Sequence, residues 1–216
     1  MTSFAARPVR LSLAALFIAT GANVQAQLPV PTRADGRALE SLRSMTRCLA
    51  GALPDEIDLY LRAAPGSSKA ERWEKHLRRS ANFCFANFGS TMRIKPPVFR
   101  GALAEALYLQ SFEPVSADES RPQATAANAP ASLDQLAACV AAAEPGSADA
   151  LLRTAWASTG EAEALVALKN GIVRCSGPRP APLAPSALRF RGVLAEALYK
   201  LRKASAGARS SSRDAT

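Results

Sequence analysis

A ten-residue stretch occurs twice in this 216-residue chain, as FRGALAEALY over 99–108 and as FRGVLAEALY over 190–199. The offset of 91 positions continues upstream without a gap, and at this offset the cysteines of the two halves coincide in two pairs. An ungapped offset that carries all four cysteines of the chain indicates a tandem duplication. The chain is therefore expected to fold as one small unit made twice.

Each copy has the pattern of short amphipathic helices. In the first copy, apolar residues recur at helical spacing in three stretches upstream of the repeated decapeptide, and Pro54 and the Pro65-Gly66 pair mark helix boundaries. No segment alternates apolar and polar residues with period two over a useful length. We therefore predict an all-α fold, a tandem duplication of a four-helix unit with one disulfide in each unit.

The domain organisation follows from the repeat. The first copy is expected over 39–110 and the second over 132–203. The intervening stretch, 111–131, is rich in Pro, Ser and Ala and has no apolar period, so it is predicted to be a linker. The end of the chain, 204–216, is predicted to be a disordered tail. The sequence does not decide whether the two copies pack together.

The first 26 residues have the three parts of a secretory signal peptide. Two arginines and no acid come first, an apolar run over 11–22 is short for a membrane span, and small residues precede a cleavage position after Ala26. We expect a signal peptide over 1–26 and a periplasmic or secreted mature chain. An uncleaved anchor or a buried helix is the alternative. No later stretch is long and apolar enough for a transmembrane segment.

The four cysteines are expected to form disulfides, because an exported chain enters an oxidising compartment. Three pairings are possible, and the symmetry of the repeat is compatible with all of them. A free-standing unit of about seventy residues has a marginal core and benefits from its own disulfide, which favours pairing within each copy. The preferred pairs are Cys48–Cys84 and Cys139–Cys175. A four-cysteine zinc site is disfavoured, because no C-x2-C pair is present.

The decapeptide is predicted to be the last helix of each copy, with Phe99, Leu103 and Leu107 on its core side. Gly101 is unusual there, because an interior glycine costs a helix about 1 kcal/mol relative to alanine. Its presence in both copies suggests that another backbone passes close to it. Arg100 falls inside the apolar arc, and a half-buried guanidinium requires a carboxylate or several carbonyl groups as partners.

Charged positions that recur in both copies predict an ion network between the second and the last helix of each copy. In the first copy we expect Asp58 to meet Arg100 and Arg62 to meet Glu105; Asp58 and Arg62 are also one helical turn apart. The matching set in the second copy is Asp149, Arg191, Arg153 and Glu196. We expect these residues to be architectural, and a ligand site built from the arginine and the glutamate is the alternative.

The two copies differ in charge. The net charge is +5 over 41–110, from eleven basic and six acidic residues, and +1 over 132–201, from seven and six. Most of the excess lies in KAERWEKHLRRS, which gives a candidate binding face made of Arg72, Lys75, His76, Arg78 and Arg79. An acidic envelope protein, an anionic polymer or a lipid surface would suit this face. A solvated face without a ligand is the alternative.

The residue types give little support to catalysis. The chain has a single histidine, and no G-x-S-x-G, S-x-x-K or H-E-x-x-H motif is present. We predict no catalytic residue, no cofactor and no metal, and a non-catalytic binding or structural role in the cell envelope. Nucleic acid is not an expected partner, because export separates the chain from it. The alternative is an envelope-degrading hydrolase that uses a pair of carboxylates, which needs no sequence motif.

Overall fold

A computed structural model describes residues 33–84, 94–115, 130–177 and 186–213. The predicted all-α fold is confirmed, since this part of the chain forms nine helices and no strand. The helices of the first copy are α1 (Arg33–Ala52), α2 (Pro54–Arg62), α3 (Ser68–Cys84) and α4 (Pro96–Ser111). Those of the second copy are α5 (Leu133–Ala143), α6 (Pro145–Arg153), α7 (Thr159–Ala167), α8 (Lys169–Ser176) and α9 (Ala187–Arg213). The predicted signal peptide lies outside the described residues.

The second copy departs from the four-helix plan in one place. The counterpart of α3 is divided at Leu168 into α7 and α8. Asn170 and Gly171 follow the division, and both are weaker helix formers than the Arg79 and Ser80 that stand at these positions of the continuous α3. The local sequence therefore accounts for the break, and the order of the elements is otherwise the same in both copies.

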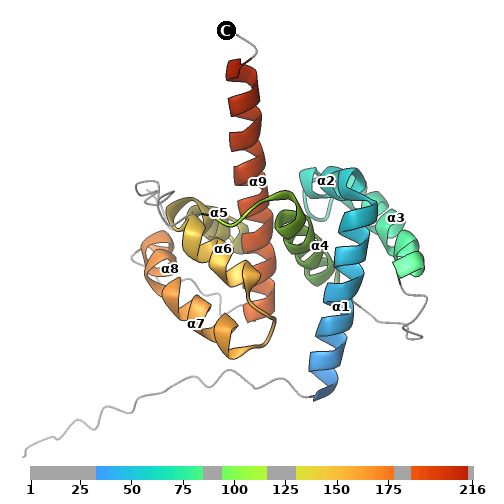
Figure 1. Cartoon of the computed structure of the whole chain (residues 1–216), viewed down its shortest axis with the longest axis horizontal. Coiled ribbons are helices and arrows are strands. Elements are labelled where there is room, and N and C mark those ends of the chain that lie inside the picture. Colours follow the sequence, from blue (N-terminus) through green and yellow to red (C-terminus); the bar gives the residue numbers. More distant parts are fainter. Residues whose placement is uncertain (1–32, 85–93, 116–129, 178–185, 214–216) are drawn as a thin grey trace, which may run out of the picture. The chain divides into compact units, whose positions relative to one another are not determined.

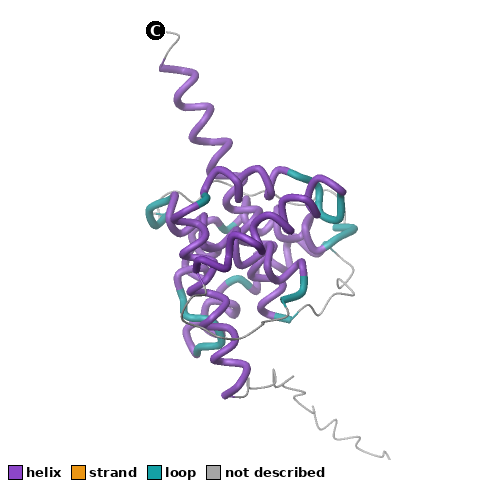
Figure 2. Tube along the Cα trace, turned by 90° about the vertical axis from the view of Figure 1, so that its right-hand side faces the viewer, coloured by secondary structure: helices purple, strands orange, loops and turns teal. Residues whose placement is uncertain are grey.

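The predicted disordered tail is wrong over most of its length, because α9 continues to Arg213. Its C-terminal end leaves the body of helices (Figures 1 and 2). The segment from Lys200 to Ala208 contains no proline and is rich in Ala, Lys and Arg, which favour continuation of the helix. Of the predicted linker 111–131, Ser111 is the last residue of α4, and residues 112–115, 130 and 131 are described and are not helical. Arg153 and Arg202 hold this segment by donating to the carbonyl oxygens of Phe112 and Glu113.

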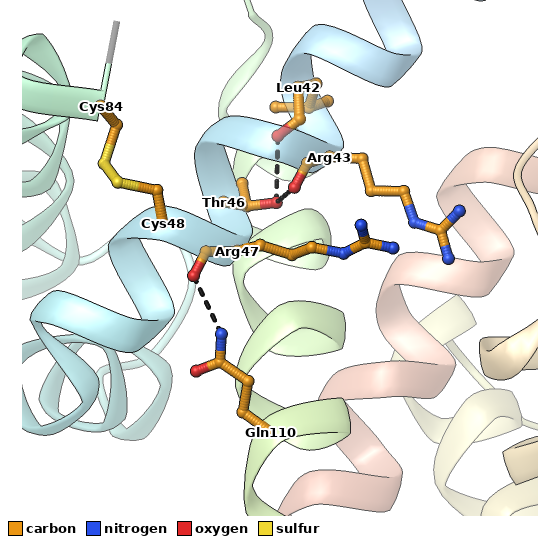
Figure 3. Close-up of a disulfide and its surroundings, with 7 residues drawn as sticks. All are labelled: Leu42, Arg43, Thr46, Arg47, Cys48, Cys84 and Gln110. Atoms are coloured by element: carbon orange, nitrogen blue, oxygen red, sulfur yellow. Dashed lines mark hydrogen bonds between the residues drawn. A yellow bond between two sulfur atoms is a disulfide. The ribbon is translucent and has the colours of Figure 1, made fainter.

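Both predicted disulfides are present. Cys48–Cys84 joins α1 to the end of α3, as Figure 3 shows, and Cys139–Cys175 joins α5 to α8. Each bond closes the same separation of 36 residues. All four cysteines of the chain are used in this way, which is consistent with an extracellular location. Among the described helices, none combines the length and the apolar character that a membrane span requires.

The centre of the fold is the contact between α4 and α9, the two helices that carry the decapeptide (Figure 1). Helix α1 packs on α4 from outside, and α5 packs on α9 in the same way. The two copies therefore share one core, and the described residues belong to one compact unit. All ten decapeptide residues from Phe99 to Tyr108 are buried, including the glutamate that helical spacing alone would place opposite the core side.

The crossing of α4 and α9 lies at the repeated glycine. A Cβ atom built on Gly101 would lie 2.5 Å from the Cα of Gly192, and one built on Gly192 would lie 2.9 Å from the Cα of Gly101. The prediction that another backbone passes close to this glycine is confirmed. The second backbone belongs to the equivalent residue of the other copy, so each glycine serves the same close approach.

The turn that follows α2 and α6 has the same conformation in both copies, but it carries different residues. Gly66 has φ 74°, and its counterpart Ala157 has φ 54°. The left-handed region costs a residue with a Cβ about 1–2 kcal/mol, whereas glycine enters it freely. The second copy therefore holds strain at Ala157 that the first copy avoids.

We expect Ala157→Gly to raise the free energy of unfolding by about 0.5–1 kcal/mol, because relief of the left-handed strain exceeds the entropy that glycine adds to the unfolded chain. The reciprocal Gly66→Ala should lower it by about 1 kcal/mol. Urea denaturation of both variants measures these changes. A lower midpoint for Ala157→Gly would contradict the strain assigned to this turn.

Candidate functional site

The two buried arginines of the decapeptides pair with glutamates of the opposite copy. Arg100 donates from Nε and Nη2 to the two carboxylate oxygens of Glu196, each at 2.7 Å. Arg191 donates in the same way to Glu105, at 2.8 Å. The predicted pairs of Arg100 with Asp58 and of Arg62 with Glu105 are therefore wrong. Because α4 and α9 cross at the glycines, the arginine next to the crossing lies within reach of the glutamate of the facing helix, and it donates to backbone carbonyl oxygens of α2.

The arginines also bind the end of the second helix of their own copy. Arg100 donates to the carbonyl oxygens of Tyr60, Leu61 and Ala63 at 2.8–3.0 Å. These carbonyls lie at the C-terminal end of α2, where helical hydrogen bonds run out. The expected link between the second and the last helix thus exists, but it runs from the guanidinium to the backbone and not to a carboxylate.

The predicted pairs within α2 and α6 are present. Arg62 Nη2 lies 2.5 Å from Asp58 Oδ2, and Arg153 Nε lies 2.8 Å from Asp149 Oδ2. Both aspartates are buried. Lys203 adds an ammonium group 2.6 Å from Asp58. Burial alone would raise the pKa of Asp58, but the hydrogen bonds from Lys203, Tyr199 and Arg62 outweigh burial and lower that pKa.

Each aspartate also accepts a hydrogen bond from the last residue of the decapeptide in the other copy. Tyr108 donates to Asp149 at 2.6 Å, and Tyr199 donates to Asp58 at 2.8 Å. Sequence reasoning missed both tyrosines, although they recur at the 91-residue offset and close the repeated decapeptide. Together with the swapped arginine pairs, these reciprocal contacts relate the copies by an approximate twofold axis.

The Arg100–Glu196 pair holds both of its charges. Burial disfavours the charge of Glu196, but the hydrogen bonds and charge of Arg100, together with Lys200, lower its pKa below the usual value. Burial likewise works against the charge of Arg100, but Glu196 outweighs it and raises the pKa of the guanidinium. A general acid of a glycosidase needs a raised carboxyl pKa. Glu196 has the opposite shift.

One hollow lies between the copies and reaches this pair. It has a volume of about 320 Å³, and we call it the open groove. Residues from both halves line it, among them Tyr60, Pro65, Ala70, Glu74, Arg100 and Glu196. Beside Arg43, Glu105 and Trp156, which correspond to Asp134, Glu196 and Pro65 of the open groove, the hollow that remains has a volume of only about 10 Å³. The approximate symmetry of the fold is therefore broken at this point.

The candidate binding face keeps four of its five residues. Arg72, Lys75, His76 and Arg79 are exposed on the outer side of α3, and we call these four the basic face. Trp73, which lies among them in the sequence, is half-buried against the core, with the ring of His76 edge-on at 5.7 Å between centroids.

Arg78 does not belong to the exposed face. Its Nε donates to Glu74 at 2.8 Å, its Nη2 donates to the carbonyl oxygen of Ile94 at 2.8 Å, and its guanidinium lies 4.5 Å from the ring centre of Phe99. It therefore fastens α3 to the start of α4. Of the candidate residues, Arg78 has a structural role that the sequence pattern did not separate from its neighbours.

The described residues contain no group of three or more His, Cys, Asp and Glu side chains that could hold a metal ion. Comparison with protein-family models, with curated proteins and with solved structures finds no match. No relative therefore indicates a function, and the chemistry of the basic face and of the open groove has to supply one.

Proposed function

We propose that this chain is an exported, non-catalytic binding protein, and that the basic face of α3 docks on an acidic surface of a partner protein in the cell envelope. The proposed export rests on the signal-peptide pattern of residues 1–26. The two disulfides are consistent with that location.

The observation that carries the proposal is the unpaired charge of the basic face. Lys200 and Lys203 pair with carboxylates, whereas other exposed basic residues such as Arg37 and Lys169 form no ion pair with a described residue and lie on other helices. Arg72, Lys75 and Arg79 are exposed, and none of them forms an ion pair with a described residue. Three cations at spacings of three and four residues on one helix produce a concentrated positive potential, which attracts and orients an acidic surface.

A protein partner is favoured over a lipid surface by where the apolar residues of α3 lie. A helix that binds a membrane places its apolar side in the lipid. The apolar side of α3, with Ala70, Leu77 and Ala81, is buried in the core instead. Phe83 alone adds a large exposed apolar side chain to this helix. The basic face thus offers charge without the apolar area that insertion requires.

Binding is also favoured over the hydrolase alternative by the state of the buried carboxylates. Glu105 and Glu196 each accept two hydrogen bonds from an arginine, and the pKa of Glu196 is lowered. A pair of carboxylates that must exchange a proton during hydrolysis would need at least one of them with a raised pKa.

The test measures binding to an acidic polypeptide. We expect the mature chain to bind fluorescent poly-L-glutamate at low salt, and Lys75→Glu with Arg79→Glu to weaken this binding at least fivefold, because both charges on the face are reversed. The matched control is Arg37→Glu with Lys169→Glu, which makes the same change in net charge at exposed positions of α1 and α8. It should weaken binding less than twofold.

Equal losses for the two double variants would show that net charge and not the basic face governs binding, and would end the proposal. Vesicles of phosphatidylglycerol provide the second arm. Tighter binding to these vesicles than to poly-L-glutamate, equally affected by Lys75→Glu with Arg79→Glu, would replace the protein partner by a lipid surface.

A further inference from the structure

We propose that the open groove binds the indole side chain of a tryptophan presented by a partner polypeptide. Because the fold is duplicated, it has a second location equivalent to the open groove. There the chain's own Trp156 occupies the space. This inference does not depend on the function proposed for the basic face.

The two locations have the same framework. In each, an arginine–glutamate pair between the copies is bounded by the turn that follows the second helix, and the turns share a left-handed residue at the equivalent position. Trp156 comes directly before that residue in the second copy, and Pro65 does so in the first. The space next to the turn is therefore comparable in the two copies, and the residue that enters it is not.

In the second copy two side chains fill this space. Trp156 donates from Nε1 to Glu105 Oε1 at 2.7 Å. Glu161 lies 3.0 Å from Arg191 Nη1. In the first copy Pro65 stands in place of the tryptophan and Ala70 stands in place of the glutamate. Both replacements line the open groove, so they account for its volume.

The arginine and the glutamate that meet these side chains in the second copy have counterparts in the first, and the glutamate keeps one open acceptor site. Glu196 Oε1 accepts from Arg100 and Lys200, so Lys200 takes the position that Trp156 occupies on Glu105. Glu196 Oε2 accepts from Arg100 alone, which leaves an acceptor site there for an indole N–H. Nη1 of Arg100 carries two hydrogens and donates to the carbonyl oxygen of Tyr60, and the Tyr60 side chain also interacts with this guanidinium. A peptide carbonyl of the occupant would be a further acceptor.

The charge of the groove also favours a neutral donor. Glu71, Glu74, Asp134 and Glu196 line it, against Arg100 and Arg189. Four carboxylates and two guanidinium groups disfavour an anionic occupant, whereas an indole contributes an N–H donor without negative charge. The volume of about 320 Å³ is at the lower end of the range for ligand pockets and suits one aromatic side chain with part of its backbone. A polypeptide supplies the indole and the carbonyl together.

The test titrates N-acetyl-L-tryptophanamide into the ¹⁵N-labelled mature chain. We expect saturable shifts at the amides of Tyr60, Ala70, Gly101 and Val193, with a Kd of about 1 mM, since the probe is small. N-acetyl-L-phenylalaninamide, which has an aromatic ring but no ring N–H, should bind at least fivefold more weakly. Free indole, which has the N–H but no carbonyl group, should also bind more weakly.

Two variants fill the groove from within. Pro65→Trp restores the tryptophan of the other copy, and Ala70→Glu restores its glutamate; each should reduce the affinity for the probe at least tenfold. Ala64→Trp, at the exposed neighbouring position, is the matched control and should change the affinity less than twofold. Far-UV circular dichroism establishes that each variant is folded, and Ala70→Glu carries the test if Pro65→Trp does not fold.

Several results would overturn the proposal. Absence of saturable shifts at the groove amides, full affinity in the folded filling variants, or equal binding of the phenylalanine probe would remove the indole site. Equal or tighter binding of free indole would remove the polypeptide occupant. Lys75→Glu with Arg79→Glu should leave probe affinity within twofold, so failure here and failure of the basic face are separate outcomes.

Discussion

Replacing Arg191 with methionine is expected to lower the free energy of unfolding by about 3–5 kcal/mol. The side chain of Arg191 is 1% exposed, and its guanidinium is within hydrogen-bond distance of six oxygen atoms, of Glu105, Glu161, Leu152 and Thr154. Removal of one partner of a buried ion pair leaves the other charge without compensation. Here a single substitution would leave two buried carboxylates, those of Glu105 and Glu161, without their guanidinium.

A double-mutant cycle separates the missing charge from the lost packing. Glu105→Gln in the Arg191→Met background removes one uncompensated carboxylate, so the double variant should unfold at a higher urea concentration than Arg191→Met alone. The matched control is Arg189→Met, two positions earlier on the exposed side of α9, for which we expect a change within 0.5 kcal/mol, about the usual limit for surface substitutions. A loss below about 1 kcal/mol for Arg191→Met would contradict the role of the pair.

The same substitution at Arg100 should cost less, because the two arginines are equivalent in sequence but not in surroundings. Arg100 pairs with Glu196 alone, and Lys200 lies 2.6 Å from that glutamate. When Arg100 is removed, the ammonium group of Lys200 still compensates part of the charge. The two halves of the fold therefore differ in the stability that their buried arginine contributes, as well as in the open groove.

The sequence was sufficient to identify the residues of the ion network between the helices, but not to assign which residue pairs with which. Asp58, Arg100 and Glu105 recur at the offset in identical residue types. A contact within a copy and its equivalent across a twofold axis use the same two residue types, so the repeat cannot distinguish them. The cysteine pairing could be predicted despite this ambiguity. A small unit benefits from its own disulfide, which favoured pairing within each copy, and this pairing is observed.

The open groove could not be predicted for a related reason. Its existence depends on positions where the copies differ, chiefly Pro65 against Trp156 and Ala70 against Glu161. Such differences are visible in the sequence, but which of them opens a space depends on the facing helix of the other copy. Helical periodicity likewise placed Arg78 with its charged neighbours and one turn from Glu74, but its contacts with Phe99 and the carbonyl oxygen of Ile94 depend on how α3 meets the start of α4.

Replacing Gly101 with alanine is expected to lower the free energy of unfolding by about 3 kcal/mol, near the upper limit of ordinary overpacking. The added Cβ would lie 2.5 Å from the Cα of Gly192 and 3.1 Å from its carbonyl carbon. Neither neighbour is a flexible side chain, so relief requires α4 and α9 to move apart. Any such movement also lengthens the swapped hydrogen bonds of the two arginines, since both lie one residue from the crossing.

Gly51→Ala is the control for this substitution, because Gly51 also lies in a helix but is exposed, and its added Cβ would meet only the Gln110 side chain at 3.9 Å. Alanine there should raise the free energy of unfolding, by up to about 1 kcal/mol, through helix propensity alone. Opposite signs for the two alanines, measured by urea denaturation, would isolate the crossing as the cause. If Gly101→Ala were neutral or stabilising, the close contact of α4 and α9, and with it the twofold arrangement of the copies, would have to be abandoned.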